Sequence, residues 1–571
     1  MFQNKLSNFE SISLIIGKKN LLKLCISIFL TICLVGLEIL SLAMIMPLMD
    51  LILNQNVENK FLFNFMQSFN YQQMYSLENI SIIFVIIYFF KTIFSIFIIF
   101  FNYSCYLNIA YFVKNKLLKK YLKMSYVKFL SKNYSQLLVD VNQTTNIFAY
   151  NFLGSIILIF SELFLFLIII ILLLFHDFAK TTFLIAMFFL FAVIYFLLTH
   201  QRIRAMGKNA VRFNQLTTRY LNEFFKGLKF IKINSKVDMY IGQINSVILN
   251  NLKIERNLSV LSSLPRISLE FVTIFLFTVL VIFFKDNNNL KFVSIMALYA
   301  VAAMKIIPSV AKILQAFQNY KFGKESFEVL KNDLIINKEN ETLQEDEDLL
   351  FLKYFKDKII LKNISFSYEN NIKEVFHKFN LEIKKGEKLI ILGKSGSGKS
   401  TLIDIILGLL KPKSGKVIID NIDLSEQKYN LNNIVGYVPQ QTFLFDDTIE
   451  KNISLEFNDS KIDYLQLKKA SNIAKLNEFV EYKKNKFQSL IGDDGSMISG
   501  GQKQRISIAR AVYKNPEIII FDEATNNLDE KVEIEIINEI LALENKTIVF
   551  ISHNKNLVKH FDKVVDLNKI N

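Results

Sequence analysis

The sequence predicts a membrane protein of two domains: an all-α transmembrane domain with six helices, followed by an α/β domain that binds a nucleotide. Three observations support this fold class. Six apolar stretches occupy the first 330 residues, the sequence GKSGSGKST fills positions 393–401, and a polar, acidic segment separates the two regions. Hydrophobic residues make up 51% of the 571 residues and charged residues only 21%, which is not the composition of a simple soluble protein.

The six apolar stretches are each long enough to cross a bilayer, which takes roughly 17–25 residues of helix. The predicted spans cover residues 21–46, 80–101, 156–175, 181–198, 260–284 and 292–317. The short segment 176–180 separates spans three and four, and residues 285–291 separate spans five and six. Two tight hairpins are therefore expected. We assign residues 1–330 to the transmembrane domain, 331–356 to a linker and 357–571 to the nucleotide-binding domain.

The connections between spans alternate in length and charge. Those after spans two and four are long and rich in lysine and arginine, whereas the others are short or nearly free of both. By the positive-inside rule the two basic connections and both termini are cytoplasmic. Each basic connection is expected to turn through a short crosswise helix, around residues 125–136 and 227–236, suited to docking into a soluble domain. An ordinary amphipathic stretch at the membrane surface is the alternative.

The net charge of +15 is explained largely by these basic connections, so it does not indicate nucleic-acid binding. Only three cysteines occur, Cys25, Cys33 and Cys105, in or beside apolar segments. They predict neither a disulfide framework nor a thiolate metal site. The polar, basic residues 1–20 do not resemble a cleavable signal, and the first apolar run is too long for a signal-peptide core.

Charged residues inside the spans are the candidates for a substrate site, because a charge in the membrane is costly unless it is paired or functional. Lys91, Lys305 and Lys312 are the main candidates, and the last two lie on nearly one face of span six. They form either a cationic cavity wall for an anionic substrate or structural pairs with neighbouring carboxylates. The other charged residues within or beside the spans are Glu38, Glu162, Arg266 and Glu270.

The stretch at 393–401 fits the phosphate-loop pattern G-x-x-x-x-G-K-[ST]. An apolar run at 388–392 precedes it and a helix-like run at 402–410 follows, which is the strand–loop–helix context that the motif needs. Backbone N–H groups of the loop and the helix N-terminus suit phosphate oxygens. Lys399 is expected to reach the β- and γ-phosphates and Ser400 to ligate Mg²⁺. The predicted loop residues are Gly393, Lys394, Ser395, Gly396, Ser397, Gly398, Lys399, Ser400 and Thr401.

Further candidate residues surround this loop in the sequence. Tyr368 follows a predicted strand at 359–366 and is placed to stack on adenine. Gln440 ends the segment Tyr-Val-Pro-Gln and is expected to touch Mg²⁺ and the attacking water. A glycine-rich turn opens a predicted helix at 504–513, where a hydroxyl, N–H groups and a helix N-terminus suit a γ-phosphate. That turn contains Ser499, Gly500, Gly501 and Gln502.

The predicted buried strand at 518–523 ends in two carboxylates. Asp522 is expected to hold Mg²⁺ through water, and Glu523 to orient or deprotonate the hydrolytic water. Asp529 follows in a short turn. His553 comes after another apolar strand at 547–551, within reach of a γ-phosphate. Glu523, His553 and Gln440 are the predicted catalytic residues, and the cofactors are ATP and Mg²⁺.

Together these elements resemble the ATP-binding cassette (ABC) transporters of the exporter type across nearly the whole chain. The resemblance implies that Tyr368 is the A-loop aromatic, that 393–401 is Walker A and that 498–502 is the signature motif. It also implies that Gln440 belongs to the Q-loop, Asp522 to Walker B and Asp529 to the D-loop, with His553 the switch histidine. Small departures are Ile498 for the usual Leu, Asn526-Asn527 in the D-loop, and Ser552 and Asn554 beside His553.

The membrane half most resembles the PglK-type flippases, which move lipid-linked oligosaccharides in bacterial N-glycosylation. The similar stretches are 161–162, 229–232, 265–267 and 304–309, together with a short external helix around 61–69. That family carries arginines where Lys91, Lys305 and Lys312 stand, and lysine lacks the bidentate fork that arginine offers to a diphosphate.

These resemblances imply an ATP-driven flippase in the bacterial cytoplasmic membrane, working as a homodimer because the signature motif of one cassette completes the ATP site of the other. The preferred substrate is a polyprenyl-diphosphate-linked oligosaccharide, moved from the inner to the outer leaflet for protein glycosylation. The alternative substrates are a lipid, a drug or a peptide, since the fold alone supports many. A nonhydrolytic ATP-gated channel is a second class, which the intact Glu523 and His553 argue against.

Overall fold

The structure is a computed structural model that describes residues 7–43, 77–174, 178–283, 290–336, 350–351, 354–368, 374–424, 429–431, 433–525 and 528–569. The chain divides into two compact units. The first comprises Met1–Met124 and Lys128–Leu343, and the second Ser125–Val127 and Gln344–Asn571. The predicted external helix at 61–69, most of the predicted linker, and Asn526 and Asn527 lie outside the described residues.

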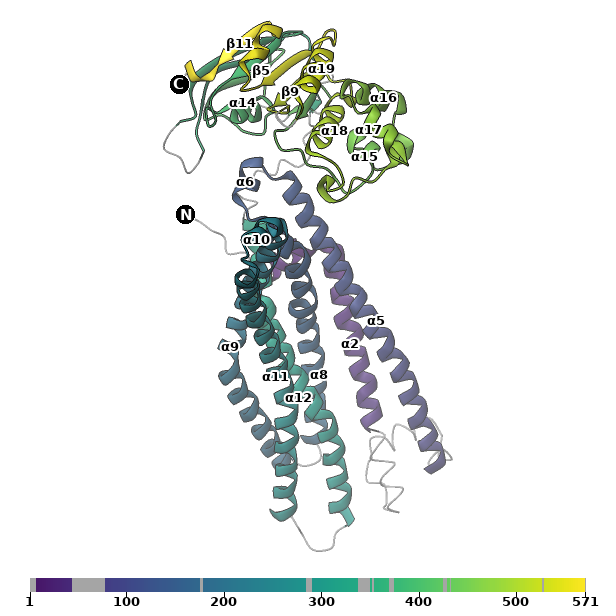
Figure 1. Cartoon of the computed structure of the whole chain (residues 1–571). Coiled ribbons are helices and arrows are strands. Elements are labelled where there is room, and N and C mark those ends of the chain that lie inside the picture. The colour runs from purple at the N-terminus through teal and green to yellow at the C-terminus, as the bar shows by residue number, and fades with distance from the viewer. Residues whose placement is uncertain are drawn as a thin grey trace. The chain divides into compact units, whose positions relative to one another are not determined.

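The first unit is entirely helical where it is described. Its long helices run side by side (Figure 1), with α12 packed against α8, α9 and α11, and α2 packed against α5 and α8. These long helices are α2 (Lys18–Ala43), α5 (Leu77–Lys123), α8 (Gly154–Leu174), α9 (Phe178–Lys226), α11 (Val237–Phe283) and α12 (Leu290–Lys331). The amphipathic helix α1 (Asn8–Ile16) precedes them and begins with a capping box between Ser7 and Glu10.

Five helical segments in the described residues are long and apolar enough to cross a membrane. They are Lys18–Ser41, Ser81–Lys123, Ile147–Ile171, Ile185–Lys226 and Val237–Phe275. They contain or overlap the first five predicted spans. The sixth predicted span, 292–317, lies within the continuous helix α12, whose first side chains are outside the described set. Because α5, α9 and α11 each exceed 45 residues, or about 70 Å, they extend well past a hydrocarbon core of about 30 Å.

Short helices occupy both predicted crosswise positions. They are α6 (Tyr126–Ser131) and α10 (Leu228–Ile233). The first ends earlier than predicted, because Asn133 caps a new helix, α7 (Tyr134–Val139), by accepting a hydrogen bond from the Ser135 N–H. The helix then continues through two π-helical segments, η2 (Asp140–Thr144) and η3 (Ile147–Leu153), into α8.

The end of α12 is tied to these neighbouring segments. A third π-helical segment, η4 (Asn332–Ile336), continues α12. Its Asp333 carboxylate accepts a hydrogen bond from the Tyr121 hydroxyl at 2.8 Å and pairs with Lys132 at 3.1 Å. The region predicted as the start of a linker is therefore helical and anchored as far as residue 336.

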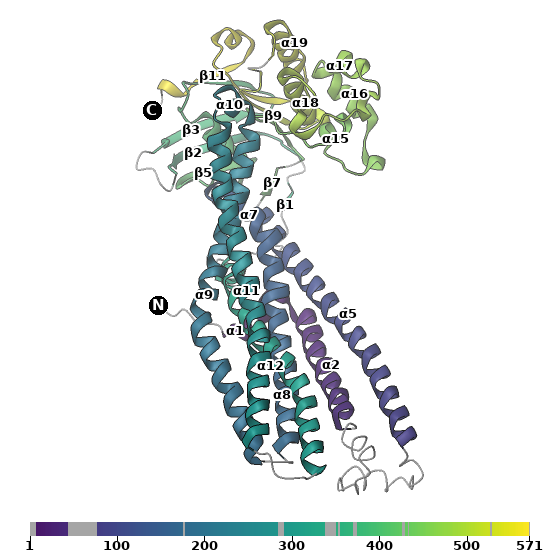
Figure 2. The same ribbon diagram turned by 60° about the horizontal axis from the view of Figure 1, so that its bottom comes forward.

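The second unit is an α/β fold built on two main sheets. A parallel sheet has the order β11-β4-β10-β9-β8, and an antiparallel sheet has the order β3-β2-β5-β6; the short β1 and β7 pair with each other. Figure 2 shows β2, β3 and β5 of the antiparallel sheet together. The strands are β1 (Leu350–Phe351), β2 (Lys358–Phe366), β3 (Phe376–Lys384), β4 (Lys388–Leu392), β5 (Ser414–Ile419), β6 (Ile422–Asp423), β7 (Tyr429–Asn430), β8 (Val435–Val438), β9 (Ile518–Asp522), β10 (Thr547–Ile551) and β11 (Lys563–Asp566).

The helices of this unit cover the sheets and form a separate helical region. They are α14 (Lys399–Ile406), α15 (Ile449–Ser454), α16 (Tyr464–Ile473), α17 (Asn477–Tyr482), α18 (Gly500–Tyr513) and α19 (Glu530–Leu541), with short 3₁₀ turns η5 to η9 at 459–461, 486–488, 493–495, 555–560 and 567–569. Buried side chains of α14 pack with the antiparallel sheet and one face of the parallel sheet, whereas those of α18 pack with α15, α16 and α19. The two helices therefore belong to different hydrophobic cores.

The sequences of the central strands β4, β9 and β10 are nearly continuous apolar runs, because both faces of a parallel sheet are covered. All five residues of β9 and of β10 are buried. Since these strands are parallel neighbours, their carboxyl ends meet at one edge of the sheet. That edge carries the phosphate-loop motif after β4, the two carboxylates at the end of β9, and His553 shortly after β10.

Candidate functional site

The loop between β4 and α14 has the backbone shape that its glycines permit. Gly396 and Gly398 have φ values of 81° and 93°, in the left-handed region that favours glycine. A Cβ at position 398 would also lie 2.7 Å from Val375 and 2.9 Å from Phe376. Any other residue at position 398 would therefore both strain the backbone and collide with neighbouring side chains.

Lys399 is folded back into the loop that precedes it. Its side chain is only 6% exposed, and its Nζ donates to the carbonyl oxygens of Gly393 at 2.9 Å and Lys394 at 3.0 Å. The same ammonium lies 3.2 Å from Oε1 of Glu523. This buried charge is thus satisfied by carbonyl groups and one carboxylate, as a buried ammonium requires.

Glu523 is the centre of the site. Its Oε1 lies 2.5 Å from Nε2 of His553, and its Oε2 accepts a hydrogen bond from Nε2 of Gln440 at 2.8 Å. Its backbone has a φ of 49°, an uncommon conformation for a residue with a side chain. The three predicted catalytic residues are therefore brought into direct contact, from the ends of β8, β9 and β10.

Asp522 forms a second oxygen cluster beside this one. Its Oδ1 lies 3.4 Å from the Ser400 hydroxyl, and the Tyr437 hydroxyl lies 3.5 Å from its Oδ2. Burial raises the pKa of Asp522, partly offset by the Ser400 hydrogen bond. Hydroxyl and carboxylate oxygens are the ligands that Mg²⁺ prefers. In the described residues no three His, Cys, Asp or Glu side chains gather as a metal site, so phosphate and water would have to supply other ligands.

Asp404 on α14 lies close enough to Asp522 to influence it. Burial, followed by the nearby Asp522 charge, raises the pKa of Asp404 from 3.8 to about 6. A carboxyl group with a higher pKa in the folded chain binds more protons than in the unfolded chain between those two values, so its contribution to stability falls as pH rises through this window.

The Asp404→Asn variant is therefore expected to be more stable than the parent at pH 7.5, in the absence of nucleotide. The difference in the midpoint of thermal unfolding should shrink as pH falls from about 6 to about 4, where the aspartate gains its proton. Unfolding curves of both proteins across this pH range provide the measurement. A difference that does not vary with pH would show that the charge of Asp404 is not responsible.

The remaining loop contacts place Tyr368 and the C-terminal 3₁₀ turn η9 at the same site. The Tyr368 hydroxyl lies 3.1 Å from the Thr401 hydroxyl, and its ring packs edge-on against Phe366. The Lys394 N–H donates to the side chain of Asn568 at 2.9 Å. The structure thus brings the predicted A-loop tyrosine to the phosphate loop.

The turn at 499–502 lies elsewhere in the unit. Ser499 caps α18, and its hydroxyl accepts a hydrogen bond from the Gln502 N–H at 3.3 Å while the Gln502 side chain accepts one from the Ser499 N–H at 2.9 Å. Ser499 and Gly500 are exposed, as is Asp529 ahead of α19. Their contacts in the described residues do not involve the phosphate loop.

In the helical unit, the three candidate lysines all have carboxylate partners. Glu38 on α2 pairs with Lys91 at 3.0 Å and with Lys305 at 3.8 Å. Lys312 on α12 pairs with Glu162 on α8 at 2.8 Å. Of the two interpretations that the sequence allows, the structure shows the paired one. The part of these three lysines in binding a substrate stays a prediction.

Comparison with known proteins gives these arrangements a family context. Residues 376–526 match the ABC transporter family model. The chain is 36% identical over 216 residues to the lactococcin-G-processing and transport ATP-binding protein LagD of Lactococcus lactis subsp. lactis, covering 38% of this chain and 30% of the relative. It is 34% identical over 281 residues to the chloroplastic ABC transporter B family member 29 of Arabidopsis thaliana, covering 49% and 44%.

Two further comparisons extend this picture. The chain is 33% identical over 267 residues to the leukotoxin translocation ATP-binding protein LktB of Mannheimia haemolytica, covering 46% of this chain and 37% of the relative. The aligned region thus spans less than half of each of these curated relatives. A solved structure of a bacterial Atm1-family ABC exporter with ATP bound superposes with a TM-score of 0.75 at 17% identity, over 96% of this chain and 94% of that one.

The chain has the fold of an ABC exporter. The predicted fold class, a helical membrane domain followed by an α/β nucleotide-binding domain, is therefore confirmed. The comparisons do not show a particular closeness to the PglK-type flippases.

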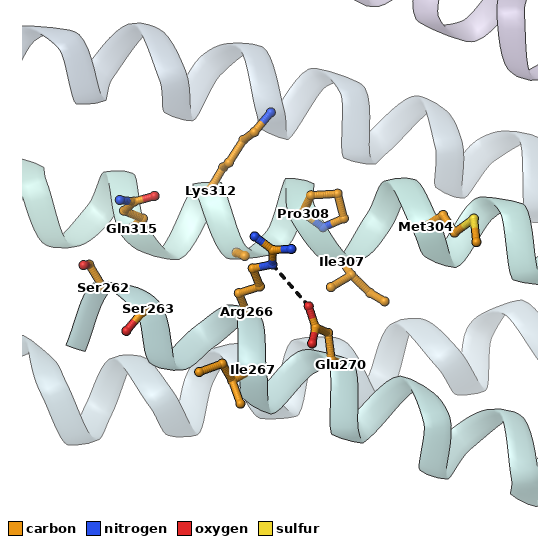
Figure 3. A pocket seen from close by; sticks show the side chains of 11 residues that line it. Ser262, Ser263, Arg266, Ile267, Glu270, Met304, Ile307, Pro308, Lys312 and Gln315 are labelled. Atoms are coloured by element: carbon orange, nitrogen blue, oxygen red, sulfur yellow. Dashed lines mark hydrogen bonds and ion pairs between the residues drawn. The ribbon is translucent and has the colours of Figure 1, made fainter. Parts of the chain in front are cut away.

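The helical unit of this ABC exporter fold contains a groove of about 850 Å³ between α11 and α12. Nε of Arg266 lies 3.2 Å from Oε1 of Glu270 on the same helix α11. Figure 3 shows these two side chains facing each other, while Lys312 of α12 points away from them. The side chains of Arg266 and Lys312 are 75% and 54% exposed. The groove is lined by Ser262, Ser263, Arg266, Ile267, Glu270, Met304, Ile307, Pro308, Ala311, Lys312 and Gln315.

Three residues of the site, Tyr437, Asn568 and Asp404, were not predicted from the sequence. Tyr437 lies in the same segment as Gln440, so its place beside Asp522 could have been anticipated from the adjacent parallel strands β8 and β9. Asn568 could not, because it lies 174 residues from Lys394 and no motif marks it. Asp404 is one helical turn beyond Ser400, and a turn of helix places such residues on the same face.

Proposed function

We propose that this chain is an ATP-driven exporter whose cassette binds and hydrolyses ATP. The observation that carries the proposal is the convergence of Gln440, His553 and Lys399 on Glu523, within 2.5–3.2 Å, beside a phosphate loop. This arrangement combines a phosphate-binding cation, a general base and two side chains that orient the base.

The residues have distinct proposed roles in hydrolysis. Loop N–H groups and Lys399 hold the β- and γ-phosphates, and Tyr368 stacks on the adenine. Glu523 accepts the proton of the attacking water, Gln440 keeps that carboxylate oriented, and His553 contacts the γ-phosphate. Ser400, Gln440 and Asp522 would hold Mg²⁺, which supplies charge neutralisation to the phosphates when bound.

A second copy of the chain is the proposed partner. The turn Ser499-Gly500-Gly501-Gln502, whose first two residues are exposed, opens α18, and a helix N-terminus suits the γ-phosphate of an ATP held by another cassette. Asp529 is exposed in the same way and is proposed to lie at that interface. A homodimer with two such sites follows, with the cassettes in the cytoplasm and the apolar helices in the bacterial cytoplasmic membrane.

The proposed substrate is a polyprenyl-diphosphate-linked oligosaccharide, moved to the outer leaflet. The support is the similarity of four membrane-half stretches to the PglK-type flippases. The groove offers exposed cations, Arg266 and Lys312, beside apolar side chains that suit a lipid. Their charge is partly offset, because Glu270 faces Arg266 and Glu162 pairs with Lys312. A peptide or protein substrate is the second candidate, favoured by the names of LagD and LktB.

One experiment separates these substrates. ATP hydrolysis is measured in liposomes with a polyprenyl-diphosphate glycan, with a peptide, and with neither, using Glu523→Gln as the blank. The glycan is expected to stimulate hydrolysis, and Lys312→Gln to weaken this stimulation, while Lys324→Gln on the same helix outside the groove leaves it unchanged. Stimulation by the peptide alone would retain the exporter and reject the glycan. Hydrolysis no greater than that of the blank would reject the exporter itself.

A further inference from the structure

Helix α11 contains a proline in its interior, and the structure shows how the resulting break is filled. Pro265 has no N–H, so the carbonyl group of Leu261, four residues earlier, loses its intrahelical hydrogen bond. An unpaired carbonyl group in an apolar environment is costly. A donor from outside the helix is therefore expected at this carbonyl.

Two side chains from neighbouring helices supply that donor. The Tyr195 hydroxyl on α9 donates to the Leu261 carbonyl oxygen at 2.5 Å, and Nε2 of Gln318 on α12 lies 3.2 Å from the same oxygen. The Gln318 amide also donates to the Tyr195 oxygen at 2.7 Å. Because these acceptors require N–H donors, they determine which end of the amide faces them.

The Gln318 side chain donates to the Leu261 carbonyl group, but its own carbonyl oxygen is left without a partner among the described residues. Gln318 is 3% exposed, and its Oε1 has no hydrogen-bond partner in the described part of the chain. A buried glutamine that leaves its own oxygen unsatisfied is costly, so a role at the Leu261 carbonyl accounts for its presence there. Tyr195, Leu261 and Gln318 together form what we call the proline clamp.

The proline clamp joins three long helices at a single point. Along a regular helix each carbonyl group bonds to a backbone N–H of the same helix. At Leu261 that bond is replaced by hydrogen bonds from side chains of α9 and α12. Sharp bends in helices occur at such positions, because fewer backbone bonds resist them. The groove between α11 and α12 begins next to the break, at Ser262, Ser263 and Arg266. Bending at the clamp would therefore change the shape of that groove.

We propose that the proline clamp is a joint of the transport cycle: it holds α11 against α9 and α12, and it opens when ATP binds. The released Leu261 carbonyl then faces water or the groove, and α11 bends at Pro265. This inference goes beyond the proposed ATP-driven export, although its second part depends on ATP binding by the cassette.

The first test asks whether the clamp compensates for the proline. Backbone hydrogen exchange at residues 262–269 is measured on the full-length protein in nanodiscs for the parent, Tyr195→Phe, Pro265→Ala and the double variant. Tyr195→Phe is expected to raise exchange about fivefold, which corresponds to a hydrogen bond worth about 1 kcal/mol. In the Pro265→Ala background, where the helix regains its own donor, the same change should have almost no effect.

The control variant separates this idea from simple packing. Ser268→Ala removes a hydroxyl that bonds within α11, to the carbonyls of Leu264 and Pro265, and should not depend on the residue at 265 in this way. Equal effects of Tyr195→Phe in both backgrounds would overturn the clamp. Gln318→Leu provides an independent variant with the same expected pattern.

The second test adds ATP to the Glu523→Gln protein, after direct measurement that ATP is bound. Hydrogen exchange at residues 262–269 is expected to rise when ATP binds. When Tyr195→Phe is also present, exchange should already be raised before ATP is added. Unchanged exchange with ATP bound would overturn the joint. A failure of ATP to bind would instead count against the proposed function, and the nucleotide-free comparison would still decide the clamp.

Discussion

Replacing Glu523 with glutamine is expected to lower ATP hydrolysis at least 100-fold, roughly the smallest effect of removing a general base. Glutamine has nearly the same size, so it retains a partner for Gln440. It cannot accept a proton from water, and it loses the charge that faces Lys399 at 3.2 Å. ATP binding should remain, because the phosphate loop and Tyr368 are unchanged. Steady-state phosphate release and equilibrium ATP binding measure the two effects separately.

The matched control is Glu535→Gln, which removes an exposed carboxylate on α19 and should leave hydrolysis unchanged. Substantial hydrolysis in Glu523→Gln would mean that another group activates the water. His553 would then be the first candidate, since its ring lies 2.5 Å from the Glu523 carboxylate.

Mixing two inactive variants is expected to restore activity. Lys399→Ala removes the phosphate-loop cation, and Gly501→Glu places bulk and negative charge in the first turn of α18. If each ATP site combines the loop of one chain with the turn of the other, a mixed dimer retains one complete site. About half of randomly formed dimers are mixed, so about a quarter of the wild-type sites should return. The measurements are ATP hydrolysis and ATP-dependent cross-linking of purified, co-reconstituted chains.

The two variants measured alone are the controls, and each should be inactive. A further control mixes the wild type with a chain that carries both substitutions. In their mixed dimer each site contains one substituted element, so the only complete sites should be those of wild-type homodimers. If the equal mixture of single variants stays as inactive as its parents in both measurements, the loop and the turn do not combine in trans. This outcome is not expected, because the contacts of Ser499 and Gln502 in the described residues do not reach the phosphate loop of their own chain.

Much of the cassette was predictable because its central strands are short, continuous runs of buried apolar residues. The predicted strands at 388–392 and 547–551 have the bounds of β4 and β10, since a continuous apolar run between turn residues reports a strand covered on both faces. Their parallel pairing then brings Lys399, Glu523 and His553 together without further information. The long helices were predictable for a similar reason: an apolar run of membrane length leaves few alternatives.

The contacts between distant side chains were not predictable in the same way. The sequence placed Glu38 and Lys91 in separate spans, but which carboxylate faces which lysine depends on how the helices rotate about their axes. Helix rotation is set by packing rather than by hydropathy. The same holds for Pro265: the missing N–H can be read from the sequence, whereas the identity of the substitute donors, Tyr195 and Gln318, requires the structure.

The position of Lys399 has one more consequence. Its ammonium is shared between two carbonyl groups of its own loop and the Glu523 carboxylate, which also contacts His553. A γ-phosphate bound in the loop would compete with the Glu523 carboxylate for this ammonium. We therefore expect ATP binding to separate Lys399 from Glu523, so that the carboxylate exchanges its cationic partner for the attacking water in the same event that fills the site.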